Sequence, residues 1–368
     1  MYGLAKVHKS TADLTYRPIL SMCDAYCSNL SKWLDQILKP HIPKHYLIKD
    51  SFDFVEKMHG LSIPNSYMVS FDVRSLFTNV PLDDTIDHIC SIIDFDKFPI
   101  NKKTLKTLLS LACKNVLFQF DDKLYIQNDG VAMGSKLAPT LANFAMDLIE
   151  KQFDRQPLFY QRYVDDVFAV FKNKLEAVEF FNYLNSLNKN IQFTMEHEQE
   201  KQLKFLDVVV HKNDDKFETE WTLKDTNTGI YVLKESFAPF KYKTAAICSL
   251  IYRAKRFSSK DIYFASAYNK IASIFINNGF HAKVIEKIRD KILNSRPSNG
   301  QSDNDVDRQR IYWRLPHIKE KEKQTLKTVH SINRILPDTC KLSVVFDTFK
   351  TSKSFPNKDK VPMSLARL

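Results

Sequence analysis

Glycine is scarce, with seven residues in a chain of 368, and the chain contains no internal repeat or low-complexity tract. The hydrophobic content of 44% is enough to bury a sizeable core, which excludes a disordered or fibrous protein. Because glycine alone readily tolerates positive φ angles and close backbone approach, each of the seven marks a special backbone requirement. Gly130 and Gly134 fall within one short segment, so that segment carries two such requirements.

Cysteine is also infrequent, and no two cysteines have the Cys-x-x-Cys spacing that is typical of zinc sites. Cys23 and Cys27 are four residues apart, as two ligands on a helix could be, but no second Cys or His pair lies near them in the sequence. We interpret the six cysteines as buried thiols in a reducing compartment.

Long apolar runs are missing as well. No stretch of eighteen apolar residues is present, and the first ten residues lack the apolar region of a secretory signal. We therefore expect an intracellular, soluble protein without a membrane partner.

Positive charge, in contrast, is abundant. Lys and Arg number 54 against 43 Asp and Glu, which gives a net charge of +11 and a pI near 9.1. This balance is typical of proteins that meet polyanions such as nucleic acids, although charge alone does not establish such a partner. A chain of this length predicts two or three subdomains.

Hydrophobic periodicity predicts the main elements. An amphipathic helix is expected within residues 21–40, a buried strand over 67–73, and helices over 101–114 and 137–153. A further strand is expected over 203–211. Beyond residue 227 the chain becomes helical and rich in Lys, Arg, Tyr and Phe, with expected helices that include 261–278 and 281–293. Residues 294–307 have almost nothing to bury and predict a linker.

Two acids lie at the tip of a predicted β-hairpin. Apolar and aromatic arms at residues 158–160 and 167–171 flank a charged turn with Asp165 and Asp166, and Asp72 ends the strand over 67–73. Burying an unpaired carboxylate is costly, so acids on such apolar elements need a cation, which Mg²⁺ would supply. In two-metal nucleotidyl transfer, carboxylates hold ions about 3.5 to 4 Å apart. The alternative is an ordinary Asp-rich turn, because Asp suits turns.

The order of the motifs decides between these interpretations. Residues 163–166 (Tyr-Val-Asp-Asp) follow residues 70–81 (Ser-Phe-Asp-Val-Arg-Ser-Leu-Phe-Thr-Asn-Val-Pro) and 131–135 (Val-Ala-Met-Gly-Ser). This set resembles the reverse transcriptases. With residues 2–9 (Tyr-Gly-Leu-Ala-Lys-Val-His-Lys) and 17–21 (Arg-Pro-Ile-Leu-Ser), it is similar more narrowly to the Penelope-like retroelement enzymes, which are related to telomerase.

The resemblance implies a fold and a reaction. The expected fold is an α+β right-hand polymerase with fingers, a palm with an antiparallel sheet and catalytic hairpin, and a helical thumb. The expected reaction is RNA-directed DNA polymerisation, in which deoxynucleoside triphosphates extend a DNA primer on an RNA template. Two Mg²⁺ ions, or Mn²⁺, would be the cofactors, and the protein would act in the nucleus. The oligomeric state stays open.

The resemblance also implies roles for single residues. Asp72, Asp165 and the Val73 carbonyl would hold the metal ions, and Asp166 would support them. Phe77 matches a steric gate that excludes the ribose 2′-hydroxyl, with core packing as the alternative.

Further residues that match the family motifs would contact the nucleotide and the template. Met133 and Gly134 would allow close approach of the template and the incoming base. Arg17 would grip the triphosphate, assisted by Lys6 and Lys9 unless these two are solvated surface charges. A proton donor to pyrophosphate is expected at Lys201 or Lys204.

Aromatic and basic residues alternate in the predicted thumb. This pattern favours contact with duplex phosphates, with a solvated basic face as the alternative. The basic residues concerned are Lys241, Lys243, Arg253, Lys255 and Arg256.

The predicted subdomains are fingers over 1–60, palm and remaining fingers over 61–215, thumb over 216–293, the linker, and a partly ordered connector over 308–368. The sequence departs from the family pattern at Ala5 and Lys136, where the family usually has proline, and we expect the chain to lack the family's GIY-YIG endonuclease. A catalytically decayed remnant that only binds nucleic acid is the main alternative. Telomere maintenance is disfavoured because no telomerase RNA-binding domain is found in this sequence.

Overall fold

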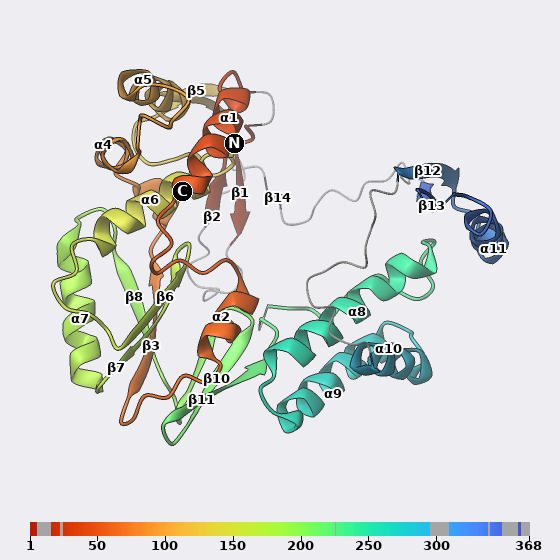
Figure 1. Cartoon of the computed structure of the whole chain (residues 1–368). Coiled ribbons are helices and arrows are strands. Elements are labelled where there is room, and N and C mark those ends of the chain that lie inside the picture. The colour runs from red at the N-terminus through yellow and green to blue at the C-terminus, as the bar shows by residue number, and fades with distance from the viewer. Residues whose placement is uncertain are drawn as a thin grey trace. The chain divides into compact units, whose positions relative to one another are not determined.

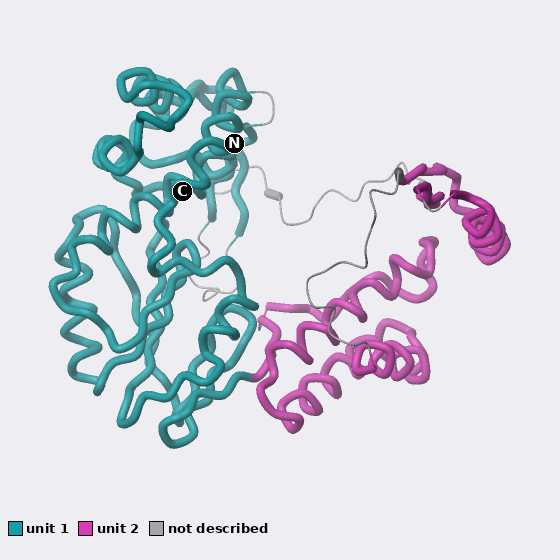
Figure 2. Tube along the Cα trace, viewed as in Figure 1, with its two compact units in different colours: residues 1–219, 356–368 teal, residues 220–355 magenta. Residues whose placement is uncertain are grey.

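The computed structural model describes residues 1–5, 16–22, 25–224, 226–294, 309–337, 339–347 and 360–361. The chain divides into two compact units, residues 1–219 with 356–368 and residues 220–355 (Figure 2). The division falls at Thr219, whereas the finer subdomain boundaries stay predictions. Lys6, Lys9, Cys23 and most of the predicted linker lie outside the described residues.

A four-stranded antiparallel sheet forms the centre of the first unit (Figure 1). Its strand order is β6–β7–β3–β8. The strands are β3 (Tyr67–Val73), β6 (Phe159–Tyr163), β7 (Asp166–Phe171) and β8 (Phe193–His197). The predicted strand at 67–73 and the predicted hairpin at 158–171 are confirmed, and so is the α+β class.

Apolar patterning explains this arrangement. Strand β7 is a central strand with five consecutive buried residues, Val167–Phe171, as expected where both faces are covered. Helix α6 (Ala138–Glu150) is buried nearly all round, and α7 (Lys174–Leu187) packs against β3, β7 and β8. Predicted helix 137–153 is thus present, and its Pro139 lies in the first turn, where proline is tolerated.

Short helices link the sheet to the preceding chain. Helix α1 (Ser28–Leu38) begins later than the predicted 21–40 and continues into η1 (Lys39–His41). Helix α2 (Ser51–Met58) begins at Asp50, whose side chain accepts from the backbone N–H groups of Phe52 and Asp53. Helix α3 (Leu76–Asn79) follows β3 after Ser75, which has φ +51°.

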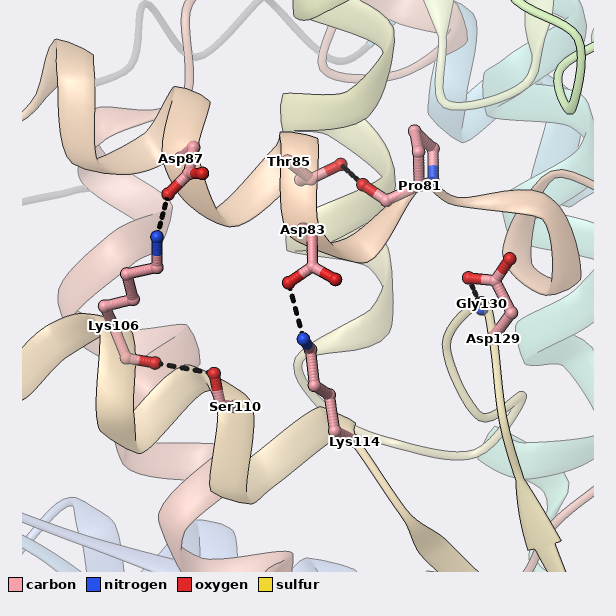
Figure 3. Close-up of polar contacts among 9 residues, drawn as sticks. All are labelled: Pro81, Asp83, Thr85, Asp87, Lys106, Ser110, Lys114, Asp129 and Gly130. Atoms are coloured by element: carbon pink, nitrogen blue, oxygen red, sulfur yellow. Dashed lines mark hydrogen bonds and ion pairs between the residues drawn. The ribbon is translucent and has the colours of Figure 1, made fainter.

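Two exposed ion pairs join α4 (Leu82–Ile92) to α5 (Lys102–Cys113) (Figure 3). Lys106 contacts Asp87 and Lys114 contacts Asp83, each at 2.5 Å. The predicted helix at 101–114 is present, and Asn101 is its N-cap, with a side-chain oxygen that accepts from the Thr104 N–H at 2.9 Å. The hairpin β4 (Val116–Phe120) and β5 (Lys123–Gln127) follows. A second sheet has the order β14–β1–β2, from Lys360–Val361, Tyr2–Ala5 and Tyr16–Ile19.

The predicted single strand at 203–211 is wrong. The structure has a tight hairpin instead, with β9 (Gln202–Phe205) and β10 (Val208–Asn213) joined at Leu206, which has φ +51°. Phe205 pairs with Val208, and both are buried, so the apolar run serves two strands. Strand β11 (Lys216–Trp221) completes this sheet.

The second unit contains three packed helices, α8 (Phe240–Phe257), α9 (Asp261–Asn277) and α10 (Ala282–Asn294). The last two agree with the predicted helices. Residues 309–347 add β12 (Gln309–Pro316), η2 (Lys319–Lys321), α11 (Glu322–Asn333) and β13 (Cys340–Asp347). Strands β12 and β13 are parallel, and α11 lies between them in sequence.

Within the described residues, none of the helices has the length and apolar character needed to cross a membrane.

Candidate active site

The three predicted catalytic acids meet at one end of the two central strands of the sheet, β3 and β7. Asp72 on β3 is the register partner of Asp166 on β7. The Val73 backbone N–H donates to the Asp165 carbonyl oxygen at 3.3 Å, which brings the end of β3 beside the turn. Tertiary pairing thus joins residues that are far apart in sequence.

We expected these acids to be buried, and for Asp72 this prediction was wrong. Asp72 is exposed, whereas Asp165 and Asp166 are half-buried. Because side chains alternate between the two faces of β3, Phe71 and Val73 point to the core and Asp72 stays accessible at the strand end. The carboxylates therefore lie where a solvated substrate could reach them.

The acidic turn, residues 163–166, has an unusual backbone. Val164 adopts φ +56° in the left-handed region. A β-branched residue rarely takes this conformation, which costs of order 1–3 kcal/mol. The surrounding structure must therefore hold the turn.

The donor set suits a hard divalent cation. Carboxylates of Asp72 and Asp165 and the carbonyl of Val73 are the oxygen ligands that Mg²⁺ prefers. In the described part of the chain, however, no three His, Cys, Asp or Glu side chains are gathered closely enough to hold an ion by themselves. The residues fit a site of two carboxylates and a carbonyl, completed by substrate and water, and the assignment stays a prediction.

Phe77 lies one short turn beyond β3. It belongs to α3, is half-buried against the main core, and its carbonyl accepts from the Val131 N–H at 2.7 Å. A Cβ on Gly130 would collide with the Thr78 backbone, so this glycine is required by the close approach of the two segments. The structure thus joins the segment after Asp72 to the segment that holds Met133 and Gly134.

Gly134 is constrained by the chain itself. It has φ +136°, and a Cβ there would collide with the Leu20 carbonyl oxygen. The Leu20 N–H also donates to the Met133 carbonyl at 2.9 Å. This contact brings β2, with the exposed Arg17, against the glycine turn. This packing requirement was not predicted from the sequence, where Gly134 was assigned only to the close approach of template and nucleotide.

Arg162, which directly precedes the acidic turn, was not predicted as a functional residue. It is 1% exposed and forms a bidentate ion pair with Glu150 of α6. Burial lowers the pKa of its guanidinium, but the charge of Glu150 outweighs this effect and keeps the pKa above its ordinary value. A usable signal was present, because Tyr160 and Arg162 share the buried face of β6, where a cation is unexpected.

A basic cleft of about 620 Å³ adjoins the acidic turn. Tyr163 and Val164 line it, together with residues of α1, α2 and α6. Its lysines are Lys39, Lys44, Lys49, Lys57 and Lys136. Lys57 donates to Gln161 at 2.6 Å, and the other four are exposed. Asp35 and Asp53 also line the cleft, which therefore presents an excess of cations over anions beside the predicted reaction centre.

Four of the five basic residues predicted for the thumb fall into two groups. Lys241 and Arg256 are exposed on α8. Lys243 is 6% exposed and donates to the Lys234 carbonyl at 2.7 Å, while Lys255 donates to the Ile292 carbonyl at 3.0 Å. These two ammonium groups satisfy carbonyl oxygens of the unit itself.

The remaining predicted basic residues are Arg253 of the thumb and the two candidate proton donors, Lys201 and Lys204. Arg253 is half-buried, with its guanidinium carbon 5.4 Å from the Phe257 ring centroid. Lys204 lies on β9, and Lys201 immediately precedes this strand with φ +59°. Nothing in this geometry assigns the proton donor.

Comparisons with known proteins support the fold. The chain is similar to the solved telomerase from Candida albicans in complex with a TWJ fragment of telomeric RNA, with 13% identity and a TM-score of 0.53 over 73% of this chain and 50% of that one. Apo telomerase from Candida tropicalis matches at 12% identity and a TM-score of 0.43, over 73% and 50%. The chain thus spans about half the length of these structures. The first similarity confirms the predicted polymerase fold.

None of the curated proteins matches the chain. Residues 230–290, which include α8 and α9, match a family described as Animal helix-turn-helix domain. Residues 7–215 match the family described as Reverse transcriptase (RNA-dependent DNA polymerase), and they include all three acids at this end of the sheet. This match covers more than half of the sequence, so the chain belongs to the reverse transcriptase family.

Proposed function

We propose that this chain is an RNA-directed DNA polymerase that adds deoxynucleotides to a primer 3′-end by two-metal catalysis. The observation that carries the proposal is the pairing of Asp72 with Asp166 and of Val73 with Asp165 at one end of the sheet. When bound, two divalent ions lower the pKa of an attacking 3′-hydroxyl and stabilise the leaving pyrophosphate. Asp72, Asp165 and the Val73 carbonyl would hold them, and Asp166 would support Asp72 from the neighbouring strand.

The substrates follow from the same proposal. The RNA template, DNA primer and deoxynucleoside triphosphates would meet at this end of the sheet, with Arg17 and Lys6 on the triphosphate and Met133 and Gly134 near the template and incoming base. The order of motifs further supports a retroelement enzyme of the Penelope-like type that acts in the nucleus. The similarity to telomerase, at 13% identity, concerns the fold alone, and no substrate is inferred from it.

Primer extension on poly(rA)/oligo(dT), with Mg²⁺ and separately with Mn²⁺, tests the proposal. We expect template-dependent DNA synthesis with at least one of the two ions. Binding of the primer–template without any extension would favour the decayed, binding-only alternative.

Phe77→Ala is expected to raise ribonucleotide incorporation relative to deoxynucleotide incorporation. The smaller side chain would leave room for the 2′-hydroxyl beside Asp72. The measurement is the ratio of kcat/KM for the two nucleotide types, with Phe95→Ala, another half-buried phenylalanine at the same core, as control. An unchanged ratio would assign Phe77 to core packing alone.

Nucleic acid would be held at two places. The basic cleft lies beside the acidic turn, and its lysines can neutralise backbone phosphates. Lys241 and Arg256 supply exposed cations on α8, within the segment that matches the helix-turn-helix family. Contacts with an RNA–DNA hybrid would fall on phosphates and sugars, without base readout.

Salt dependence separates these two places. Joint replacement of Lys39, Lys44 and Lys49 with Ala should flatten the slope of log affinity against log salt, by about 0.9 for each lost phosphate contact on B-form DNA and by a similar amount on a hybrid. The pair Lys241→Ala and Arg256→Ala should act likewise through the second unit. The matched control is Lys97→Ala with Lys106→Ala, since both lysines form exposed ion pairs outside the cleft. If a set of substitutions gives the same salt slope as the control, the replaced residues belong to a solvated basic face and do not contact nucleic acid.

A further inference from the structure

The strongest unexplained feature of the first unit is the buried guanidinium of Arg162. Its Nε and Nη2 donate to the two carboxylate oxygens of Glu150, at 2.6 and 3.0 Å. Its Nη1 donates to Asn143 Oδ1 at 2.8 Å and to the Val164 carbonyl at 3.0 Å. Four hydrogen bonds therefore fix one side chain that is 1% exposed.

A buried ion pair is weak evidence of a stabilising role. A buried ion pair is often no more stabilising than well-packed apolar residues of similar volume, because desolvation of both charges offsets their attraction. Glu150 and Asn143 are themselves 6% and 8% exposed, so the whole network lies inside the protein. Its position directly beside the acidic turn points to a role in geometry.

The hydrogen bond to Val164 defines that role. Val164 is the strained residue of the acidic turn, with φ +56°, and Asp165 follows it directly. A left-handed Val persists only where its surroundings determine the conformation. Arg162 holds the Val164 carbonyl from inside the protein, while the Val73 N–H holds the Asp165 carbonyl from β3.

The backbone of Arg162 is fixed as well. Its N–H donates to the Tyr46 carbonyl at 2.8 Å, and its carbonyl accepts from the Ile48 N–H at 2.9 Å. The side chain, in turn, is tied to α6 through Asn143 and Glu150. Arg162 therefore links the turn to two separate parts of the core.

We propose that Arg162 is a positioning residue for polymerisation, which holds the left-handed conformation of Val164 and thereby the placement of Asp165, with Glu150 as its counter-ion. The proposal rests on the proposed function and deepens it. Arg162 touches neither substrate nor metal, and it acts through the acidic turn.

A double substitution separates positioning from folding. Arg162→Met with Glu150→Leu removes both charges together, so no unpaired charge is buried and the fold should be retained. The Val164 carbonyl then loses its donor. The matched control is His88→Phe with Asp147→Leu, because His88 Nε2 of α4 and Asp147 Oδ2 of α6 form another buried pair, at 2.7 Å. Arg162→Lys is the second test variant, since it keeps the charge but cannot span Glu150 and Val164 with a planar fork.

Three measurements are made on the full chain: thermal unfolding, the single-turnover extension rate on poly(rA)/oligo(dT), and amide hydrogen exchange. We expect the Arg162 variants to unfold near the wild-type temperature, yet to lose about 10²-fold in maximal rate, the effect of misplacing a reacting group by about 1 Å. KM for primer–template should stay unchanged, and the Val73 amide and peptides over 163–166 should lose protection. The control should change neither rate nor protection of the turn.

The outcomes are distinguishable. A variant that folds normally, keeps turn protection and extends primers within about threefold of wild type overturns the positioning role. Failure of both Arg162 variants to fold would make the pair a folding element and also overturn it. If the wild-type chain itself extends no primer, the proposed function fails, while hydrogen exchange still reports whether Arg162 holds the turn.

Discussion

Asp165→Asn should reduce the rate of primer extension by about 10³-fold or more. In the proposed mechanism, loss of one carboxylate would weaken the hold on a divalent ion that would supply several kcal/mol of charge stabilisation, and each 1.36 kcal/mol is a factor of ten in rate. Folding should survive, because Asn has nearly the same size and turn preference. The Val73 N–H bonds to the backbone carbonyl of residue 165, which the substitution retains.

The matched control for this substitution is Asp83→Asn. Asp83 forms an exposed ion pair with Lys114 at 2.5 Å, and such pairs contribute little to stability. Its extension rate should stay near that of the wild type. If Asp165→Asn retains substantial extension with a normal circular dichroism spectrum, the two-metal assignment is wrong.

Gly134→Ala should abolish most extension and lower the stability of the first unit. The positive φ of +136° alone costs about 1–3 kcal/mol for a residue with a Cβ. In addition the Cβ would collide with the Leu20 carbonyl, which is backbone and cannot rotate away. Either β2 or the 133–135 turn must shift, and a shift of about 1 Å can cost 10²-fold in rate.

Gly60→Ala separates these two causes. Gly60 has φ +80°, but an added Cβ would have no atom within 4 Å. It should lose stability through backbone strain alone and extend primers at the wild-type rate. Chemical denaturation and single-turnover extension measure both effects. If the two variants have equal extension rates, the contact between Leu20 and Gly134 does not affect the reaction.

Local sequence signals were sufficient to predict a helix or strand where that element buries one regular face. The strand at β3 and the hairpin of β6 and β7 follow from runs of apolar residues interrupted by acids, and the capping Asn101 marks the start of α5. The same reasoning failed at residues 203–211. An apolar run has the same composition whether it forms one strand or two, and only the left-handed backbone at Leu206 turns it into a hairpin.

Single residues show a similar limit. Lys243 and Lys255 look like part of a basic face by spacing, yet their ammonium groups bond to carbonyl oxygens of neighbouring segments. Gly134 was assigned to ligand approach, whereas the contact that requires glycine is with Leu20. These three partners lie nine or more residues away along the chain, so the spacing of the lysines and of the glycine contains no signal for them.

The sequence by itself determined which residues are predicted to carry the chemistry: three acids at the ends of apolar strands, in the motif order of the reverse transcriptases. Only the tertiary structure decided how they are held. The register of β3 against β7 places Asp72 opposite Asp166, and burial of the Arg162–Glu150 pair supports the strained Val164. The physical reason is that composition and periodicity report the burial of a side chain, whereas its partner across the core depends on packing between segments that are distant in sequence.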